Sequence, residues 1–596
     1  MLNIFQIFRQ QLNSTILDIA QKNQISITEN ELKSYAIEPT KELSFGDIAS
    51  NIAMYFAKKF QLSPKDLANQ IINQLDKEYI EKIEIAGAGF INIFLKNQIF
   101  YKVIESINQE NEITLPNLGN NVKVNIEYAS PNPTGPMHVG HTRGAIFGDV
   151  MAKLMQKVGY DVLKEYYIND AGGQINTLIK SAYIRYIQAL GVDVNITENL
   201  YPGEYLIQVG EEIKKQFGDS LSKMDFEEYF PKIRDLVLDE MLKIIKSDLQ
   251  ALGIFHDSYF SEKKQLHNQD KITKIIDFLH QKNLIYVGKL SAPKTEKGVG
   301  AIPEGYEDQD QTLFRSSDFG DDQDRVVLKS DGSPTYFGAD LAYLKSKFER
   351  GARIFVMPLG YDHAGYVKRL TSACNAITDH QAELKIILCQ MVKFVKDGEP
   401  LKMSKRAGNF ITAKQVLDEI GADALRFIML TRKNDAPFDF DLNKVVEQSK
   451  DNPIFYVQYA HTRCCSVIRN LKNENPEFYQ KIFENNQINS KNISSILENL
   501  DDQNEINLIK KIANYIRIIE MAVHNYEPHK IAFYLQDLSA EFHSLWNKGV
   551  ENPNLKFILV DDFSKTYARI LLINSVKKII ANGLEVFNIK ALEYMN

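Results

Sequence analysis

His138-Val-Gly-His141 and, about 260 residues further along the chain, Lys402-Met-Ser-Lys405 are the two stretches that decide the fold. Before the first, an apolar run from Val122 to Ile126 leads through prolines and glycines into a helical pattern that starts at Thr142. A strand, a turn and a helix start in this order favour an anion, because the first amides of a helix are unpaired and its dipole is positive there. Two imidazoles three residues apart fall on one side of the first helical turn. The first stretch therefore predicts a site where both histidines face one triphosphate.

The second stretch is predicted to lie on a loop that follows a β-hairpin. Asp397-Gly398 is a turn signal between the strand-like segments 391–395 and 400–403. Lysines on such a loop are usually a solvated charge cluster. In combination with the histidine motif, they are expected to neutralise the charge that builds up on a leaving pyrophosphate. The two motifs together predict one ATP site made from the two halves of a nucleotide-binding fold.

These motifs are the two signatures of class I aminoacyl-tRNA synthetases, and the residues around them resemble the arginyl-tRNA synthetase family. The resemblance is carried by several separate segments, which are 45–53, 86–92, 127–149, 166–174, 314–325, 331–340, 402–426 and 452–461. It therefore spans almost the whole chain. It implies a multidomain α/β protein with a Rossmann-type catalytic domain that carries an insertion, an N-terminal α+β domain and a C-terminal all-α helical bundle.

Composition sets limits on the class of protein. The 596 residues are too many for one core, and 44% apolar and 25% charged residues are typical of a soluble globular chain. The four cysteines have no zinc-ligand spacing, so we expect a reducing compartment and no protein-held metal. We find no apolar run long enough to cross a bilayer, and we therefore expect a cytoplasmic protein without a membrane partner. The net charge of −7 does not predict tRNA binding, but 70 Lys and Arg residues are enough to form one basic face.

The pattern along the chain predicts three domains. Residues 1–110 form an α+β domain, and 108–121 read as a linker. Residues 121–412 form the Rossmann-type catalytic domain, with an insertion near 172–310. Residues 413–596 form a helical bundle, in which 471–505 are expected to be an exposed, mobile excursion. Helicity alone leaves a structural appendage or a dimerisation module open for the bundle. The resemblance implies that the bundle binds the anticodon, that the N-terminal domain contacts the outer corner of the tRNA, and that the protein is a monomer.

The implied reaction has two steps, in which L-arginine and ATP form arginyl-adenylate and the arginyl group then moves to the 3′ end of tRNA(Arg). ATP is a substrate, and Mg²⁺ is expected with it. Because pyrophosphate leaves in the first step, catalysis should rest on positioning and electrostatics. The expected catalytic residues are His138, His141, Lys402 and Lys405. The expected ATP-binding residues are His138, Gly140, His141, Asp362, Met403, Ser404 and Lys405.

Arginine recognition requires carboxylates, because a planar guanidinium is held best by charge-assisted hydrogen bonds. The family-like segments supply the expected arginine-binding residues, which are Glu127, Ser130, Asn132, His141, Tyr336, Asp340 and Tyr361. For tRNA, the candidates are Tyr459, Trp546, Tyr567 and Met595, although aromatic residues at helical spacing more often belong to a core. Two departures from the family stand out: Tyr361 replaces a Gln or Ala, and Arg406 ends the lysine motif.

Three alternatives are weighed against this interpretation. Another nucleotidylyl transferase with the histidine motif would not need the N-terminal domain or about 180 residues after the lysine motif. A cysteine enzyme would need a zinc site, and a leucine enzyme would have little use for Asp340 and Glu127. A tRNA-binding paralogue without activity should have lost residues from His138, Gly140, His141 or the lysine motif, and all are present.

Overall fold

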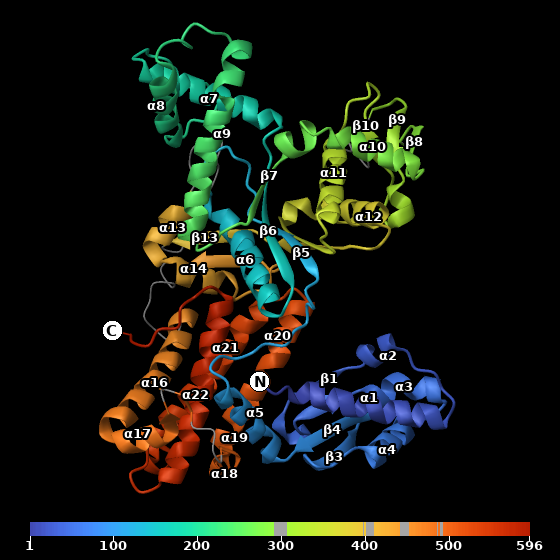
Figure 1. The fold of residues 1–596 in the computed structure, drawn as a ribbon, viewed down its shortest axis with the longest axis vertical. Helices are drawn as coiled ribbons and strands as arrows, with labels where there is room; N and C mark the ends of the chain where they lie inside the picture. The colour runs from blue at the N-terminus through green and yellow to red at the C-terminus, as the bar shows by residue number, and fades with distance from the viewer. Residues whose placement is uncertain are drawn as a thin grey trace.

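The computed structural model describes residues 1–290, 307–396, 399–400, 411–441, 452–484, 487–488 and 493–595. The predicted site residues Lys402, Met403, Ser404 and Lys405, together with Arg406, lie outside the described residues. The parallel sheet occupies the middle of the molecule, with the helical bundle and the N-terminal domain on one side of it and the helices α7, α8 and α9 projecting on the other (Figure 1). The predicted fold class, a multidomain α/β protein with a C-terminal helical bundle, is confirmed.

The central sheet is parallel, and its strand order is β12-β11-β5-β6-β7. Its strands are β5 (Lys123–Glu127), β6 (Asp161–Ile168), β7 (Ser258–Ser261), β11 (Ile354–Gly360) and β12 (Glu383–Cys389). From β5 the chain first adds strands on one side and later returns to add β11 on the other. In sheets wound in this way, ligands bind beyond the carboxyl ends of the two strands where the direction of winding reverses. The site is therefore expected beyond the ends of β5 and β11.

The chain between β6 and β11 forms two additional units. Helices α7 (Gly173–Ala189), α8 (Tyr205–Phe217) and α9 (Phe226–Ala251) pack around a core of their own. After β7 come α10 (Lys271–Gln281) and an antiparallel sheet of β8 (Ile285–Gly288), β9 (Gln311–Phe314) and β10 (Arg325–Leu328). Helices α11 (Tyr336–Glu349) and α12 (Val367–Thr378) then flank β11 in the chain. The region predicted as an insertion thus also contains an edge strand of the central sheet, β7.

The N-terminal domain packs helices against an antiparallel sheet of order β1-β2-β4-β3. Its elements are α1 (Ile4–Lys22), α2 (Glu29–Ser34), β1 (Ile37–Pro39), β2 (Ile48–Ser50), α3 (Ile52–Phe60), α4 (Pro64–Gln74), β3 (Ile80–Ala86), β4 (Phe90–Leu95) and α5 (Asn97–Gln109). Asn108, predicted to begin a linker, is instead buried in α5, and its amide donates to the Leu571 carbonyl oxygen and the Ser575 hydroxyl. This helix therefore attaches the domain to the bundle.

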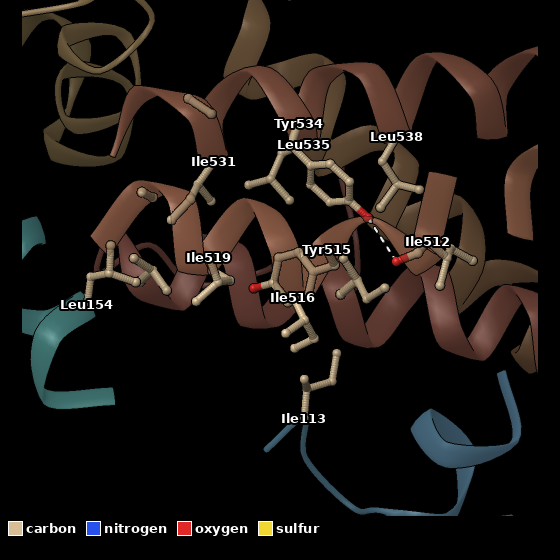
Figure 2. Close-up of a cluster of buried hydrophobic side chains, with 14 of the residues drawn as sticks. Ile113, Leu154, Ile512, Tyr515, Ile516, Ile519, Ile531, Tyr534, Leu535 and Leu538 are labelled. Carbon is tan, nitrogen blue, oxygen red and sulfur yellow. Dashed lines mark hydrogen bonds between the residues drawn. The ribbon is translucent and has the colours of Figure 1, made fainter. Parts of the chain in front are cut away.

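The C-terminal part is helical, as predicted. It contains α13 (Ala413–Ile420), α14 (Ala422–Met429), α16 (Pro453–Glu474), α17 (Pro476–Ile482), α18 (Ile493–Leu497), α19 (Gln503–Ala513), α20 (Tyr515–His524), α21 (His529–Glu551) and α22 (Phe563–Val586). The expectation of an exposed excursion at 471–505 is wrong, because Ile482, Leu497 and Leu500 are fully buried. Figure 2 shows residues of α20 and α21 packed with Leu154 of the catalytic domain and Ile113 of the chain before it. The bundle and the catalytic domain thus share one core.

Arg426 joins three elements at the border between these domains. Its side chain is 1% exposed, and its guanidinium donates to the Asp149 carboxylate on α6 (Thr142–Lys157). It also donates to the carbonyl oxygens of Leu252, at the end of α9, and Phe587, at the end of α22. The last helix is thereby fixed to the helix that follows the first motif. Among the described helices, none has an apolar stretch long enough to cross a bilayer.

Candidate active site

The first motif lies directly beside the residues that follow the second motif. The Val139 amide donates to the Ile411 carbonyl oxygen at 3.0 Å, and the Ala413 amide donates to that of Met137 at 2.8 Å. Between them, His138 and Thr412 face each other as an antiparallel pair. The chain that leaves the lysine motif is therefore held by backbone hydrogen bonds against the histidine motif. This contact joins the histidine motif to residues about 270 positions further along the chain.

The two histidines stack at the start of α6. A single turn, Val139–His141, connects β5 and its loop to this helix, and the imidazole centroids are 3.5 Å apart with 25° between the rings. A Cβ atom on Gly140 would lie 2.8 Å from both Cε1 and Nδ1 of His138, closer than van der Waals contact allows. Glycine at this position therefore permits the stacked pair, and the pair lies at a helix N-terminus beyond β5.

We predict that Gly140→Ala lowers kcat of ATP–pyrophosphate exchange by roughly 10- to 100-fold, because the added methyl displaces the His138 ring. Exchange is the partial reaction that the family resemblance implies, and its kinetics are the measurement. Gly144→Ala is the matched control on the same helix, since its Cβ would meet no atom within 4 Å. Equal activity of the two variants would contradict the role given to His138.

The other side of the switch point carries Tyr361 and Asp362. They directly follow β11, the neighbour of β5 in the sheet, and Tyr361 is 48% exposed. The Asp362 carboxylate lies 3.6 Å from the His363 imidazole, and both side chains are open to solvent. Their position at the carboxyl end of β11 places them across the switch point from the end of β5. Polar groups thus flank this point on both sides.

Three carboxylates act on the hydroxyl of Tyr167 through their negative charges. Burial and then the negative charges of Glu262, Asp340 and Glu127 raise the pKa of Tyr167, whose hydroxyl donates to Glu262. Asp340 lies on the first turns of α11, and Glu127 ends β5. The sequence predicts Asp340 and Glu127 at one pocket, and the negative charges of both act on this tyrosine. Such a concentration of negative charge suits a cation.

Glu262 is the residue that sequence reasoning missed. It follows β7 and precedes a single π-helical turn, Lys263–His267, and turns of this kind are frequent at functional sites. Its side chain is 9% exposed and lies 3.1 Å from the His267 imidazole. Asp170, inside one of the family-like segments, fixes the turn by accepting from the Lys263 amide and the Ser261 hydroxyl. The only available signal was an acidic residue directly after a strand, and the strand itself lay within the predicted insertion.

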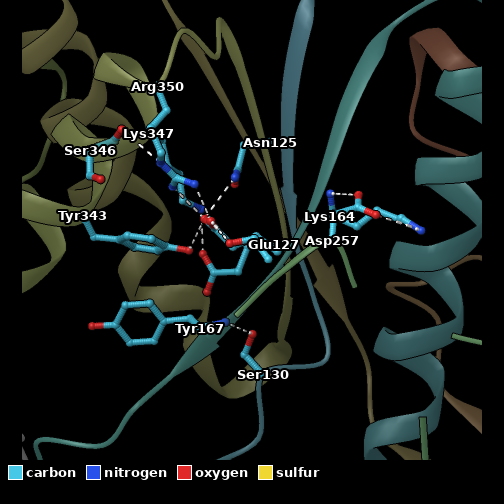
Figure 3. A network of polar contacts seen from close by, with 12 residues as sticks. Asn125, Glu127, Ser130, Lys164, Tyr167, Asp257, Tyr343, Ser346, Lys347 and Arg350 are labelled. Atoms are coloured by element: carbon cyan, nitrogen blue, oxygen red, sulfur yellow. Dashed lines mark hydrogen bonds and ion pairs between the residues drawn. The ribbon is translucent and has the colours of Figure 1, made fainter. Parts of the chain in front are cut away.

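Glu127 takes part in a buried ion network on the same side of the sheet. Lys347, which is fully buried, donates to the Glu127 carboxylate at 2.7 Å. Glu165 on β6, also fully buried, accepts from both terminal nitrogens of Arg350, from the Tyr343 hydroxyl and from the Asn125 amide. Figure 3 shows Tyr343, Lys347 and Arg350 reaching toward β5 and β6. The network fixes α11, which carries Asp340, to the strand that leads into the first motif.

The remaining predicted arginine-binding residues have less central contacts. The Ser130 hydroxyl accepts from the Tyr167 amide at 2.9 Å, and the Asn132 side chain donates to Gln174 at 2.8 Å. Both therefore lie on the loop between β5 and the histidine motif. Tyr336 is 66% exposed at the start of α11, one turn before Asp340. The structure thus leaves the Tyr336 ring open to solvent near the carboxylate cluster.

Of the tRNA candidates, two are brought together. The Arg463 guanidinium lies 4.3 Å from the Tyr459 ring centroid and 4.7 Å from that of Trp546. Tyr567 instead packs its ring edge to face against Phe478, and burial raises its pKa. Met595 is the last described residue and is partly buried. Among the described residues, no group of three or more His, Cys, Asp and Glu side chains is arranged to hold a metal ion.

Four family models match the chain. They are described as "Arginyl tRNA synthetase N terminal domain" (residues 6–95), "tRNA synthetases class I (R), catalytic domain" (103–292), "tRNA synthetases class I (I, L, M and V)" (339–441) and "DALR anticodon binding domain" (457–595). The matches follow one another along the chain, and the longest stretch between two of them is 293–338.

Proteins similar over their full length are arginine–tRNA ligases. The ligase of Brucella anthropi is 44% identical over 594 residues, which cover 99% of each chain, and that of Brucella suis is 45% identical over the same shares. The solved structure of Thermus thermophilus arginyl-tRNA synthetase has a TM-score of 0.73, with 99% of this chain and 100% of that chain covered. Its sequence identity is 16%, so that likeness concerns the fold alone.

Proposed function

The chain belongs to the arginyl-tRNA synthetase family, and from this membership we propose which residues perform each step of its reaction. It is an arginine–tRNA ligase, which uses ATP to activate L-arginine and transfers the arginyl group to tRNA(Arg), giving AMP and pyrophosphate. The observation that supports the residue assignment is the pairing of Met137–Val139 with Ile411–Ala413, because it holds the chain that follows the lysine motif against the stacked histidines.

In the first step, the arginine carboxylate attacks the α-phosphate of ATP, which enters as its Mg²⁺ complex. His138 and His141, at the start of α6, contact the phosphates, while the backbone at Gly140 allows close approach. Asp362 binds the nucleotide from the end of β11. Met403 and Ser404 contact ATP, and Lys402 and Lys405 neutralise the leaving pyrophosphate. No enzyme nucleophile takes part in this step.

The charges around Tyr167 suit arginine. Glu127, Glu262 and Asp340 provide three negative charges, and Lys347 offsets one of them. Two remain, and a pair of carboxylates can hold one guanidinium by charge-assisted hydrogen bonds. We assign the guanidinium to Asp340 and Glu262, with Tyr336 closing over it.

The other end of the amino acid is assigned to the loop after β5. Ser130, Asn132 and His141 bind the α-amino and carboxylate groups, and Tyr361 approaches from β11. Glu127, through its ion pair with Lys347, fixes the position of α11 and of the carboxylate on it.

The outer domains are assigned to tRNA. We propose that residues 1–110 contact the outer corner of the molecule, that 121–412 form the catalytic domain and that 413–596 bind the anticodon. Tyr459 and Trp546, joined by Arg463, are the best supported base-stacking residues, because unstacked bases bind aromatic and guanidinium faces. Met595 is a further candidate, and the packing of Tyr567 against Phe478 makes it a weaker one. The enzyme is proposed to act as a cytoplasmic monomer.

A pyrophosphate-exchange assay tests this function. With tRNA(Arg) present, arginine is expected to support exchange at least 100-fold faster than lysine or citrulline, because only arginine pairs a guanidinium with the two carboxylates; this margin is of the order that loss of a buried charged contact produces. Citrulline is the sharper control, since it has nearly the shape of arginine without its side-chain charge. Exchange supported equally by citrulline would reject the assigned carboxylate pocket.

A further inference from the structure

Arg143 lies two residues after the histidine motif, on the first turn of α6, and is 1% exposed. Its guanidinium donates to three backbone carbonyl oxygens, those of Lys433 at 2.8 Å, Ala436 at 2.9 Å and Gln390 at 3.0 Å. Burial lowers the pKa of Arg143. The three hydrogen bonds that its guanidinium makes to described residues all go to carbonyl oxygens and none to a carboxylate. Burying an apolar side chain of similar size would cost less free energy than burying this cation. The presence of arginine at this position therefore points to a role for its hydrogen bonds.

The three carbonyls belong to the starts of two paired strands. Gln390 precedes β13 (Val392–Lys396), while Lys433 and Ala436 lie on the turn before β15 (Phe438–Asp441). These strands pair in parallel, beginning with Val392 opposite Phe438, and the Arg143 guanidinium lies 5.7 Å from the Phe438 ring centroid. One side chain thus holds the beginning of both strands against the helix of the first motif.

The segment that starts at β13 ends at the pairing described for Ile411–Ala413. Its first residues are attached through Arg143, and its last residues are attached through Met137 and Val139. The lysine motif lies in sequence between these two attachments. Both therefore connect this segment to the seven residues 137–143, which include the stacked histidines. The two ends of the segment that contains the lysine motif in sequence are thus both held against the first motif.

We propose that Arg143 is a positioning residue for adenylate formation, which holds the starts of β13 and β15 against the helix that begins at the histidine motif. The inference rests on the proposed function of the two motifs. A guanidinium suits this role better than an ammonium group, because its rigid fork of donors serves three fixed acceptors at once. Arg143 does not contact arginine or ATP in this scheme. Its loss should consequently change the rate of the chemical step rather than the affinity for arginine.

The test is the kinetics of arginine-dependent pyrophosphate exchange by Arg143→Lys at saturating tRNA(Arg), expressed per folded enzyme. We expect kcat to fall roughly 100-fold, since a displacement near 1 Å can cost this much, and KM for arginine to stay within about twofold. If Arg143→Lys does not fold, Arg143→Gln replaces it, because the amide keeps two donors without a charge.

Arg569→Lys is the matched control. Arg569 is equally buried and also serves three acceptors, Glu505 and the carbonyl oxygens of Asn554 and Lys556, but within the bundle. It should lower the melting temperature and leave kcat unchanged. If kcat of the Arg143 variant matches that of this control, or if its kcat and arginine KM change together, the positioning role is rejected. If the unmodified enzyme shows no arginine-dependent exchange, the proposed function itself fails, which is a separate outcome.

Discussion

Asp340→Asn is expected to raise KM for arginine by roughly 100-fold, or about 3 kcal/mol, while KM for ATP stays within about twofold. The amide keeps the shape of the side chain, but one of its two ends becomes a donor that opposes the guanidinium. The negative charges of Asp340, Glu262 and Glu127 all act to raise the pKa of the Tyr167 hydroxyl. Removing the Asp340 charge takes away one of the two charge-assisted acceptors proposed for the guanidinium.

Glu262→Gln should have an effect of similar size, because the two carboxylates are proposed to bind one guanidinium. The double variant is expected to raise KM for arginine by less than the two single variants combined. Free-energy effects of residues that bind the same group are not additive. Glu349→Gln is the control, because it removes one negative charge from the exposed end of the same helix, α11. Steady-state exchange kinetics over arginine and ATP concentrations give both KM values. Equal increases in both would remove these carboxylates from the arginine pocket.

Glu165→Ala is expected to destabilise the catalytic domain by roughly 3–5 kcal/mol, the usual result of removing one partner from a buried ionic network. Glu165 is completely buried, and its loss leaves the Tyr343 hydroxyl and the Asn125 amide without their carboxylate acceptor. Arg350, which is partly exposed, can turn toward solvent, but Tyr343 cannot because it is buried. Asp161→Asn, an exposed carboxyl on the same strand, is the control and should change stability little.

The same residue predicts a dependence on pH. Burial acts to raise the pKa of Glu165, but hydrogen bonds from Arg350 and Tyr343 and the charges of Lys347 and Arg350 outweigh it and lower the pKa to about 2. Because the folded pKa lies below the unfolded one, this contribution is complete above about pH 4.5 and is lost as the pH falls toward 2. A depression of this size corresponds to roughly 3 kcal/mol.

Urea unfolding monitored by far-UV circular dichroism between pH 2 and 7 measures how the free energy of unfolding depends on pH. Glu165→Gln cannot take up the proton, so its stability should fall less steeply than that of the unmodified protein between pH 4.5 and 2. The slopes of unfolding free energy against pH should differ between the two proteins by close to the value for one bound proton. Parallel pH profiles for the two proteins would show that Glu165 does not titrate in this range and would contradict the assigned network.

The parts of the fold and site that depend on local chemistry could be predicted from the sequence. Glycines, prolines and the spacing of His138 and His141 predict a strand, a turn and a helix start, and these are observed with the two rings stacked. The apolar periodicity of the C-terminal part predicts its helices, although the break at Asn514 between α19 and α20 has no strong signal in the sequence. Asp340 and Glu127 were predicted at one pocket because family-like segments contain them, and both lie near Tyr167.

The parts of the fold and site that depend on tertiary pairing could not be predicted from the sequence. Glu262 reaches the pocket only because β7 joins the far edge of the sheet, and four residues give too weak a pattern to predict that strand. The Lys347–Glu127 ion pair joins residues 220 positions apart, and nothing in either segment indicates it. Burial in the 471–505 region could not be predicted either. The segment is mostly polar, and its few apolar residues form no pattern that indicates packing into the bundle.

The position of β5 in the sheet has a consequence for the synthesis of the protein on the ribosome. One edge of β5 pairs with β6, which is synthesised within about 40 residues. The other edge pairs with β11, whose first residue comes 227 positions after the last of β5, so it stays unpaired until then. At roughly 5–20 residues per second, that edge stays open for about 10–45 seconds. An unpaired central strand is a template for wrong partners, so the nascent chain should depend on a chaperone during this interval. The arrangement that gives the enzyme its binding site at the switch point thus also delays the completion of its core.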